Sequence, residues 1–137
     1  MSRAVRSSQR PPRSYLAFDF GTRRVGVATG NALTGTATPL TTLSAQGETL
    51  LAAIAALIDS WRPDALVVGV PLHPDGAAHA NTARARRFAR SLGARFGLPV
   101  HEVDERYTTT EARRVGSADL DAGAAAIILE QHLASLA

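Results

Sequence analysis

Acidic residues in three separate parts of the chain are the strongest candidates for catalysis or ligand binding in this sequence. Asp19 ends the apolar run Leu16-Ala17-Phe18 and precedes a Gly21-Thr22 turn, so it stands at the end of a predicted buried strand. A carboxylate in such a place is costly to desolvate unless a ligand binds it. The two usual ligands are a divalent metal and a phosphate-bearing molecule.

The other acids are expected to reach the same place from different elements. Asp104 and Glu105 close a predicted strand, and Asp121 lies in the first turn of the last predicted helix. Ligands of open α/β sheets gather at the carboxyl ends of the parallel strands. Converging carboxylates repel one another unless they bind Mg²⁺ or Mn²⁺, which prefer oxygen ligands. Two such ions about 3.5–4 Å apart can activate a water and stabilise the leaving oxygen in phosphodiester hydrolysis.

Each acid also has a purely structural explanation. Asp121 could simply favour the helix dipole, Asp104 and Glu105 could pair with nearby arginines, and Asp19 could form the turn. Taken together, the four are better explained as ligands of one two-metal site. Glu111 is different, because it is the last residue of Thr108-Thr109-Thr110-Glu111, which fits a helix capping box. We therefore interpret Glu111 as structural.

Length and composition narrow the function. The chain has 137 residues, enough for one domain. ATPases with a similar Asp-x-Gly-Thr turn need two such domains around the nucleotide, so an ATP-binding function is a minor alternative. The absence of cysteine excludes thiolate chemistry and cysteine zinc sites. No apolar run approaches the roughly 18–20 residues of a membrane span, and no secretory signal is visible. We therefore expect a soluble, cytoplasmic protein with no membrane partner.

The basic residues point to nucleic acid as the partner. There are 15 basic and 12 acidic residues, giving a formal net charge of +3, and every basic residue is an arginine. Residues 1–14 form a predicted flexible basic tail ahead of one domain over 15–137. Five further arginines crowd one predicted helix, namely Arg84, Arg86, Arg87, Arg90 and Arg95. Arginine binds phosphate bidentately and stacks on bases, which favours nucleic-acid binding.

Apolar periodicity predicts a mixed α/β domain with an antiparallel start and later parallel strands. Pro39 inside the third strand is typical of a sheet edge. The predicted strands are 15–20, 24–30, 36–42, 65–70 and 98–105, and the predicted helices are 48–61, 79–96, 109–115 and 119–135.

Four motifs, in this order, resemble those of the YqgF/RuvX family: Phe18-Asp19-Phe20-Gly21-Thr22; Gly69-Val70-Pro71-Leu72 with Asp75-Gly76; Asp104-Glu105-Arg106 with Thr109; and Asp121 with 124–130. The resemblance covers about residues 15–136. It implies a ribonuclease H-like fold, with a five-stranded mixed sheet in the order 3-2-1-4-5 and helices on both faces. It also implies metal-dependent cleavage of nucleic acid, since the members of that family are identified as pre-16S rRNA nucleases related to RuvC-type Holliday junction resolvases.

The resemblance also assigns roles. Asp19, Glu105 and Asp121 match the family's catalytic acids, with Asp104 as the alternate to Glu105. The implied role is maturation of the 5′ end of the small-subunit rRNA. The family's basic loop before the last acid is shorter here, so substrate binding is expected to depend on Arg84, Arg86, Arg87 and Arg90. Other substrates and roles stay open: branched DNA, cleaved by a Holliday junction resolvase, or RNA bound by a non-catalytic assembly factor. The chain could be a monomer or a homodimer.

Overall fold

The computed structural model describes residues 12–21, 23–71, 80–104 and 120–136. The predicted short helix over 109–115 lies outside these residues. The described elements, in chain order, are β1 (Ser14–Phe20), β2 (Val25–Asn31), β3 (Thr36–Leu43), α2 (Gly47–Trp61), β4 (Ala65–Val70), α3 (Ala80–Phe96), β5 (Val100–Asp104) and α5 (Leu120–Ser135). None of the helices in these described ranges is both long and apolar enough to span a bilayer.

The five strands form one mixed sheet in the order β3-β2-β1-β4-β5, which confirms the predicted order. β1 is central, antiparallel to β2 and parallel to β4. β3 is an edge strand, and its pairing with β2 shifts register between Val27 and Ala28, where Pro39 lies opposite Ala28. Proline has no N–H to donate to a ladder, so an edge position with a register shift accommodates it.

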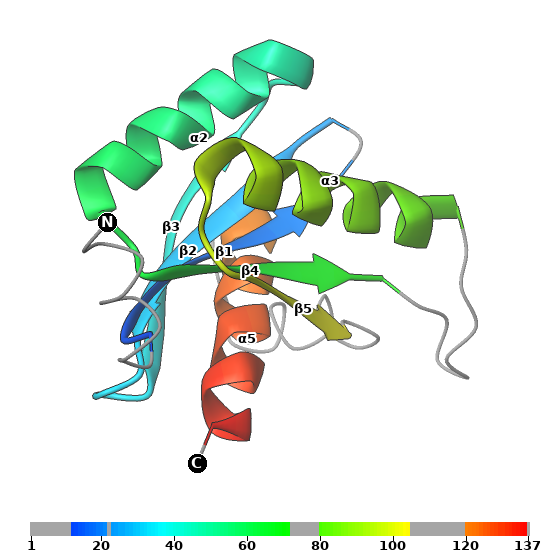
Figure 1. The fold of residues 1–137 in the computed structure, drawn as a ribbon. Coiled ribbons are helices and arrows are strands. Elements are labelled where there is room, and N and C mark those ends of the chain that lie inside the picture. Colours follow the sequence, from blue (N-terminus) through cyan, green and yellow to red (C-terminus); the bar gives the residue numbers. More distant parts are fainter. Residues whose placement is uncertain (1–11, 22, 72–79, 105–119, 137) are drawn as a thin grey trace.

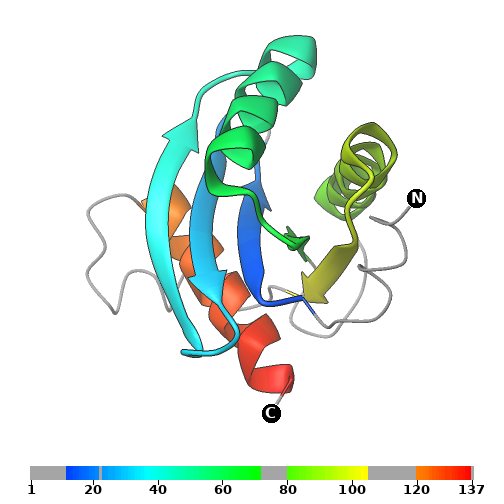
Figure 2. The same cartoon turned by 60° about the vertical axis from the view of Figure 1, so that its left-hand side comes forward.

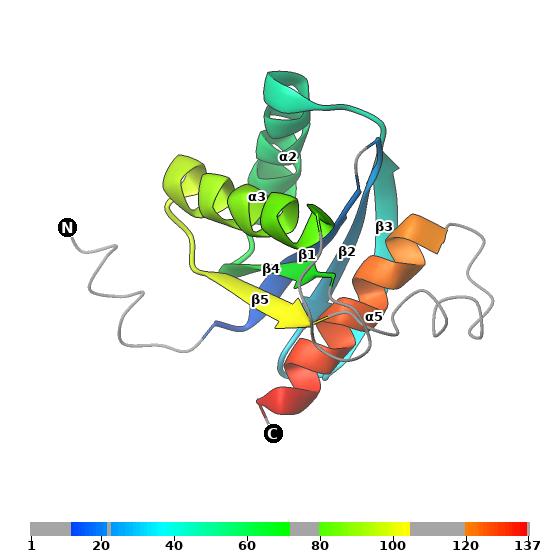
Figure 3. The same ribbon diagram turned by 90° about the vertical axis from the view of Figure 1, so that its right-hand side faces the viewer.

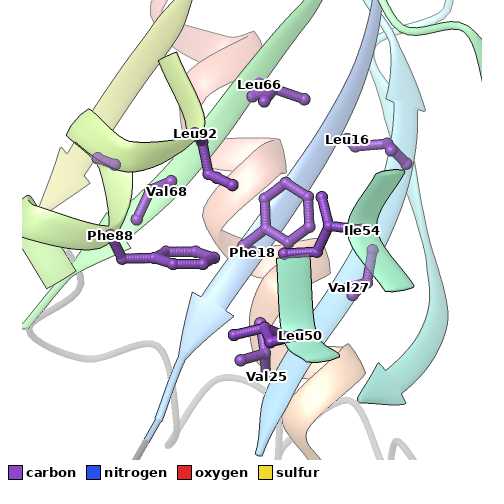
Figure 4. Close-up of a cluster of buried hydrophobic side chains, with 11 residues drawn as sticks. Leu16, Phe18, Val25, Val27, Leu50, Ile54, Leu66, Val68, Phe88 and Leu92 are labelled. Atoms are coloured by element: carbon purple, nitrogen blue, oxygen red, sulfur yellow. The ribbon is translucent and has the colours of Figure 1, made fainter. Parts of the chain in front are cut away.

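Side-chain alternation along the strands gives the sheet two different faces. Figures 1 and 3 show α2 and α3 over one face and α5 across the other. The α2/α3 face carries the larger apolar cluster, which Figure 4 shows in close-up: Leu16, Phe18, Val25, Val27, Leu66 and Val68 from the strands, with Leu50, Ile54, Phe88 and Leu92 from the helices. The α5 face carries Tyr15, Ala17, Ala65 and Val67 against Ile128, Leu129 and Leu133.

The two faces are covered by helices of different composition. α5 buries the run Ala122-Gly123-Ala124-Ala125-Ala126, and such small side chains let a helix backbone lie close to a sheet. α2 buries Leu50 and Ile54 and ends at Arg62, whose left-handed backbone (φ 49°) lets its N–H bond to the Ile58 carbonyl at 2.7 Å. Trp61, the last residue of α2, is 46% exposed.

Polar contacts tie the helices and the first strand together. Arg95 on α3 donates two hydrogen bonds of 3.1 Å to the Glu48 carboxylate on α2, and these bonds hold the pKa of Glu48 below its usual value. Figure 2 shows α2 and α3 on the same side of the sheet. Arg95 is therefore engaged in a helix–helix contact.

β1 begins at Ser14, one residue earlier than predicted, because the backbone N–H groups of Arg13 and Ser14 donate to Asp64.

A histidine pair packs between β5 and α5. The rings of His101 and His132 stack with centroids 4.7 Å apart, and Tyr15 meets His132 edge-on at 5.3 Å. The Nε2 atoms of both histidines are buried and make no hydrogen bond within the described part of the chain. Burial, and secondarily the neighbouring His101, lower the pKa of His132 below 6.5. The His132 ring is therefore favoured in its neutral form.

We expect acid to destabilise the protein through His132. Since the folded-state pKa lies below 6.5, the unfolded chain binds more protons once the pH falls through that value. Stability from the neutral ring is therefore complete above pH 6.5 and is lost as the pH falls towards the folded-state pKa. Urea unfolding of the wild type and His132→Phe, compared from pH 7.5 to pH 5.5, should show a shallower pH dependence in the variant. Identical pH dependence in the two proteins would contradict this account.

Candidate active site

The α5 face of the sheet holds Asp19 in an open position. Asp19 lies opposite Gly26 in β2 and level with Gly69 in β4. Residues opposite one another in adjacent strands project from the same face, so a glycine flanks the Asp19 carboxylate on each side. Asp19 is partly exposed, although the preceding residues of β1 are buried. Neither strand neighbour therefore places a side chain beside this carboxylate.

The first turn of α5 lies directly on Gly26. A Cβ atom added to Gly26 would come within 1.8 Å of the Asp121 carbonyl oxygen and 2.8 Å of the Ala122 nitrogen. The helix can therefore begin at this point only because residue 26 has no side chain. Opposite residues of an antiparallel pair have their Cα atoms about 5 Å apart, so Asp121 lies one strand away from Asp19. The structure thus brings Asp19 and Asp121 to the same face and the same end of the sheet.

Arg24 is a further member of this site that sequence reasoning missed. Its Nε lies 3.1 Å from Oδ2 of Asp121, and the two side chains are 64% and 32% exposed. The turn that carries Arg24 is closed by the Gly21 N–H, which donates to the Arg24 carbonyl at 2.9 Å. A Cβ at Gly21 would lie 2.7 Å from that carbonyl oxygen, so the turn requires glycine. The available signal was a basic residue five positions after the strand-terminal Asp19.

The structure separates Asp104 from the other acids. Asp104 is level with Val70 of β4, and alternation places both on the α2/α3 face. Glu102, two residues earlier, confirms the direction, since its carboxylate lies 3.6 Å from Nε of Arg86 on α3. Asp104 therefore projects away from Asp19 and Asp121. Glu105, the other predicted acid of this pair, lies outside the described residues.

The acids on the α5 face offer the type of ligand atom that a hard divalent cation prefers. Asp19 and Asp121 offer carboxylate oxygens, the donors that Mg²⁺ and Mn²⁺ prefer. Among the residues that the structure describes, no three acidic or histidine side chains gather as a metal-binding group. A third protein ligand on this face would thus have to come from the undescribed part of the chain, to which Glu105 belongs.

The predicted nucleic-acid-binding arginines lie in a different layer. Arg84, Arg86, Arg87 and Arg90 are all exposed on α3, which covers the face opposite to α5. Arg86 is engaged with Glu102, as described above. The first turn of α3 is joined to the end of β4, because the Thr82 hydroxyl donates to the Pro71 carbonyl. Arg84 therefore lies closest along the helix to the end of the sheet that carries Asp19.

The described surface also has a pocket of about 310 Å³ at the opposite end of the sheet, where β1 begins. Ser14, Thr29, Asn31 and Thr38 form its sheet side, and Trp61 is at its rim. It contains none of the predicted acids, so it is separate from the site around Asp19.

Comparison with known proteins agrees with this arrangement. The family model described as RuvX, Holliday junction resolvase, matches residues 13–135. This chain belongs to the RuvX family. A relative from Polaromonas sp. (strain JS666) is 63% identical over 90% of this chain and 89% of its own length, and one from Albidiferax ferrireducens is 61% identical over 90% and 79%. Both are named "Putative pre-16S rRNA nuclease".

A solved structure shares the fold of this RuvX chain. Thermus thermophilus RuvC, solved in complex with a Holliday junction substrate, superposes with a TM-score of 0.59 over 90% of this chain and 95% of that one. The sequences are 16% identical, so the likeness concerns the fold alone. It confirms the ribonuclease H-like architecture predicted from the sequence motifs.

We expect Gly26→Ala to displace the start of α5 from the sheet. The added methyl group would collide with backbone atoms of Asp121 and Ala122, which cannot turn aside as a side chain can. Overpacking of this kind costs about 1–3 kcal/mol or more, measurable by urea unfolding. The matched control is Gly93→Ala in α3, where the new Cβ would meet Val100 at 3.6 Å and the Leu98 carbonyl oxygen at 4.0 Å, both ordinary contact distances. Equal stabilities for the two variants would show that Gly26 is not the required contact.

Proposed function

We propose that this protein is a metal-dependent nuclease that trims the 5′ end of pre-16S rRNA in the cytoplasm. Membership of the RuvX family makes it a nuclease, and the names of its relatives point to the rRNA substrate. The observation that supports the metal-dependent part best is the placement of Asp19. It projects between two glycines, with Asp121 held one strand away on the same face.

In the proposed mechanism the metal would supply the chemistry, and the acidic residues would hold the metal in place. When bound, one or two Mg²⁺ or Mn²⁺ ions would activate the attacking water and stabilise the leaving oxygen. Asp19 would be the central ligand, because a rigid strand in the middle of the sheet fixes its position. Asp121 would be the second ligand, fixed by the contact between α5 and Gly26. On the β4 side, the lack of a side chain at Gly69 would help a phosphate group to approach Asp19.

Glu105 is the third acid that we propose, as ligand and catalytic residue. Asp104 belongs to the α2/α3 face, so it cannot serve the α5 face without a reversal at the end of β5. Its neighbour Glu105 is one residue further along the chain and is the remaining acid of the predicted pair. The structure of the described residues thus favours Glu105 over Asp104 within that pair.

A second candidate substrate is a four-way DNA junction. The RuvX family model carries the description Holliday junction resolvase, which favours this alternative. Resolution of a junction requires two cuts and hence two active sites, so this function would need a homodimer. A single RNA cut can be made by a monomer, and the mass in solution therefore bears on the choice between the two.

For the chemistry, we expect Asp19→Asn and Glu105→Gln each to lower the cleavage rate on the order of 10³-fold or more. Each change replaces a charged metal ligand with a neutral one of similar shape, and the lost charge stabilisation amounts to several kcal/mol at the transition state. Asp104→Asn is the matched control and should retain most of the activity. Initial rates in Mn²⁺ on structured RNA, single-stranded RNA and a DNA junction give the measurement.

Two outcomes would overturn parts of this proposal. Cleavage that persists in EDTA, or in Asp19→Asn, would remove the metal site and leave a non-catalytic RNA-binding assembly factor as the better description. Loss of activity in Asp104→Asn with an active Glu105→Gln would exchange the roles of these two acids.

For substrate binding, we expect Arg84→Ala to weaken RNA binding more than Arg90→Ala does. A residue adds 1.5 Å along a helix, so Arg90 lies about 9 Å further than Arg84 from the end of the sheet that carries Asp19. A lost phosphate contact should lower the slope of log affinity against log salt by about 1. Fluorescence anisotropy with a labelled RNA at several salt concentrations gives both values. Unchanged affinity and slope in both variants would place the substrate away from α3.

A further inference from the structure

The ion pair between Arg24 and Asp121 occupies an oxygen that the proposed metal would need. Nε of Arg24 lies 3.1 Å from Oδ2 of Asp121. Arg24 lies in the turn that joins β1, which carries Asp19, to β2, on which α5 begins. We propose that Arg24 is an exchangeable counterion: it holds Asp121 before a divalent ion binds, and then binds a phosphate group of the substrate. This inference rests on the nuclease function proposed above.

The backbone of Arg24 is fixed, while its side chain is largely exposed apart from its contact with Asp121. Its carbonyl accepts the Gly21 N–H at 2.9 Å, and β2 begins at the next residue, Val25. The Arg24 side chain is 64% exposed, so solvent surrounds much of its length. An arginine anchored in this way can exchange one acceptor for another by side-chain rotation alone, without any change in the sheet.

The strength of the pair is suited to exchange. With Arg24 64% exposed and Asp121 32% exposed, water reaches the pair and screens it, and ordering the long arginine side chain costs entropy, so the pair contributes modestly. A divalent ion bound by several carboxylates competes for Asp121 with twice the charge. The guanidinium would thus be displaced when the ion binds, and would remain within a side-chain length of the site.

The displaced guanidinium is chemically suited to a phosphate group. Its planar fork of N–H donors binds two phosphate oxygens at once, as it binds a carboxylate. A phosphodiester aligned over Asp19 would bring its oxygens beside the turn that carries Arg24. The exposed Arg84 and Arg90 on α3 lie on the opposite layer, so they are not placed for this role.

A merely structural ion pair predicts the opposite effect on metal binding. If Arg24 only oriented Asp121, its removal would loosen a ligand and weaken the binding of the ion. If Arg24 competes with the ion, its removal takes away one competitor for Oδ2 of Asp121 and strengthens binding. Metal affinity measured without substrate therefore separates the two roles, and it does so independently of catalysis.

The experiment compares the wild type with Arg24→Gln, Arg24→Lys and the control Arg62→Gln. Arg62 is also exposed and ion-paired, with Asp59 at 3.9 Å, but it follows α2, in the layer opposite α5. Mn²⁺ titrations followed by electron paramagnetic resonance give the affinity of the full chain for the ion. Cleavage rates at saturating Mn²⁺ and RNA give kcat, and thermal unfolding confirms that each variant is folded.

We expect Arg24→Gln to bind Mn²⁺ on the order of threefold more tightly, as the modest strength of an exposed pair implies, and to cleave at least about tenfold more slowly. Arg24→Lys, which keeps the charge, should bind Mn²⁺ like the wild type, and Arg62→Gln should match the wild type in both measurements. Equal or weaker Mn²⁺ binding by Arg24→Gln, or an undiminished kcat, would overturn the inference while the nuclease function stands. A wild type that neither binds Mn²⁺ nor cleaves RNA would overturn the proposed function and the inference with it.

Discussion

The contact between the backbone of α5 and Gly26 is the constraint on which the site depends. A side chain at residue 26 would occupy the space taken by the Asp121 carbonyl, so the helix could not begin there. Because Gly26 is also the antiparallel partner of Asp19, the same contact sets where the helix starts and which acid it faces. The run of small residues from Ala122 to Ala126 continues this close approach along the sheet. Glycine and alanine thus position carboxylates that lie about a hundred residues apart in the chain.

The two faces of the sheet have different roles, one in the hydrophobic core and one in the candidate active site. The α2/α3 face buries the large apolar side chains, including the Phe18 and Phe88 rings, and carries the predicted substrate-binding arginines on its outer surface. On the α5 face, the row Gly26, Asp19, Gly69 lies near the carboxyl ends of β1 and β4. A central strand makes both arrangements possible, because alternation sends Phe18 into the core and Asp19 into the site. The packed core on the α2/α3 face therefore holds β1 in place, and with it the partly exposed Asp19 on the α5 face.

Much of the fold was predictable from local sequence patterns, and the features of the site that were not predictable have physical causes. The period-2 and period-3.6 patterns placed the strands and helices, and Pro39 marked the edge strand correctly. The sequence left Asp104 and Glu105 as alternates, because adjacent strand residues project from opposite faces and only the pairing with β4 assigns Asp104 to the α2/α3 face. Arg24 and Gly26 were missed because their roles arise from contact with Asp121, far away in the chain.

The central claim is that a divalent ion binds on the α5 face beside Asp19. Anomalous scattering from crystals grown or soaked with Mn²⁺ tests it most directly, because it locates the ion without relying on activity. The account predicts a peak with carboxylate oxygens of both Asp19 and Asp121 at about 2.0–2.6 Å, with Glu105 completing the protein ligands. A peak at Asp104 on the α2/α3 face, or no peak near Asp19 at Mn²⁺ concentrations that support cleavage, would contradict it.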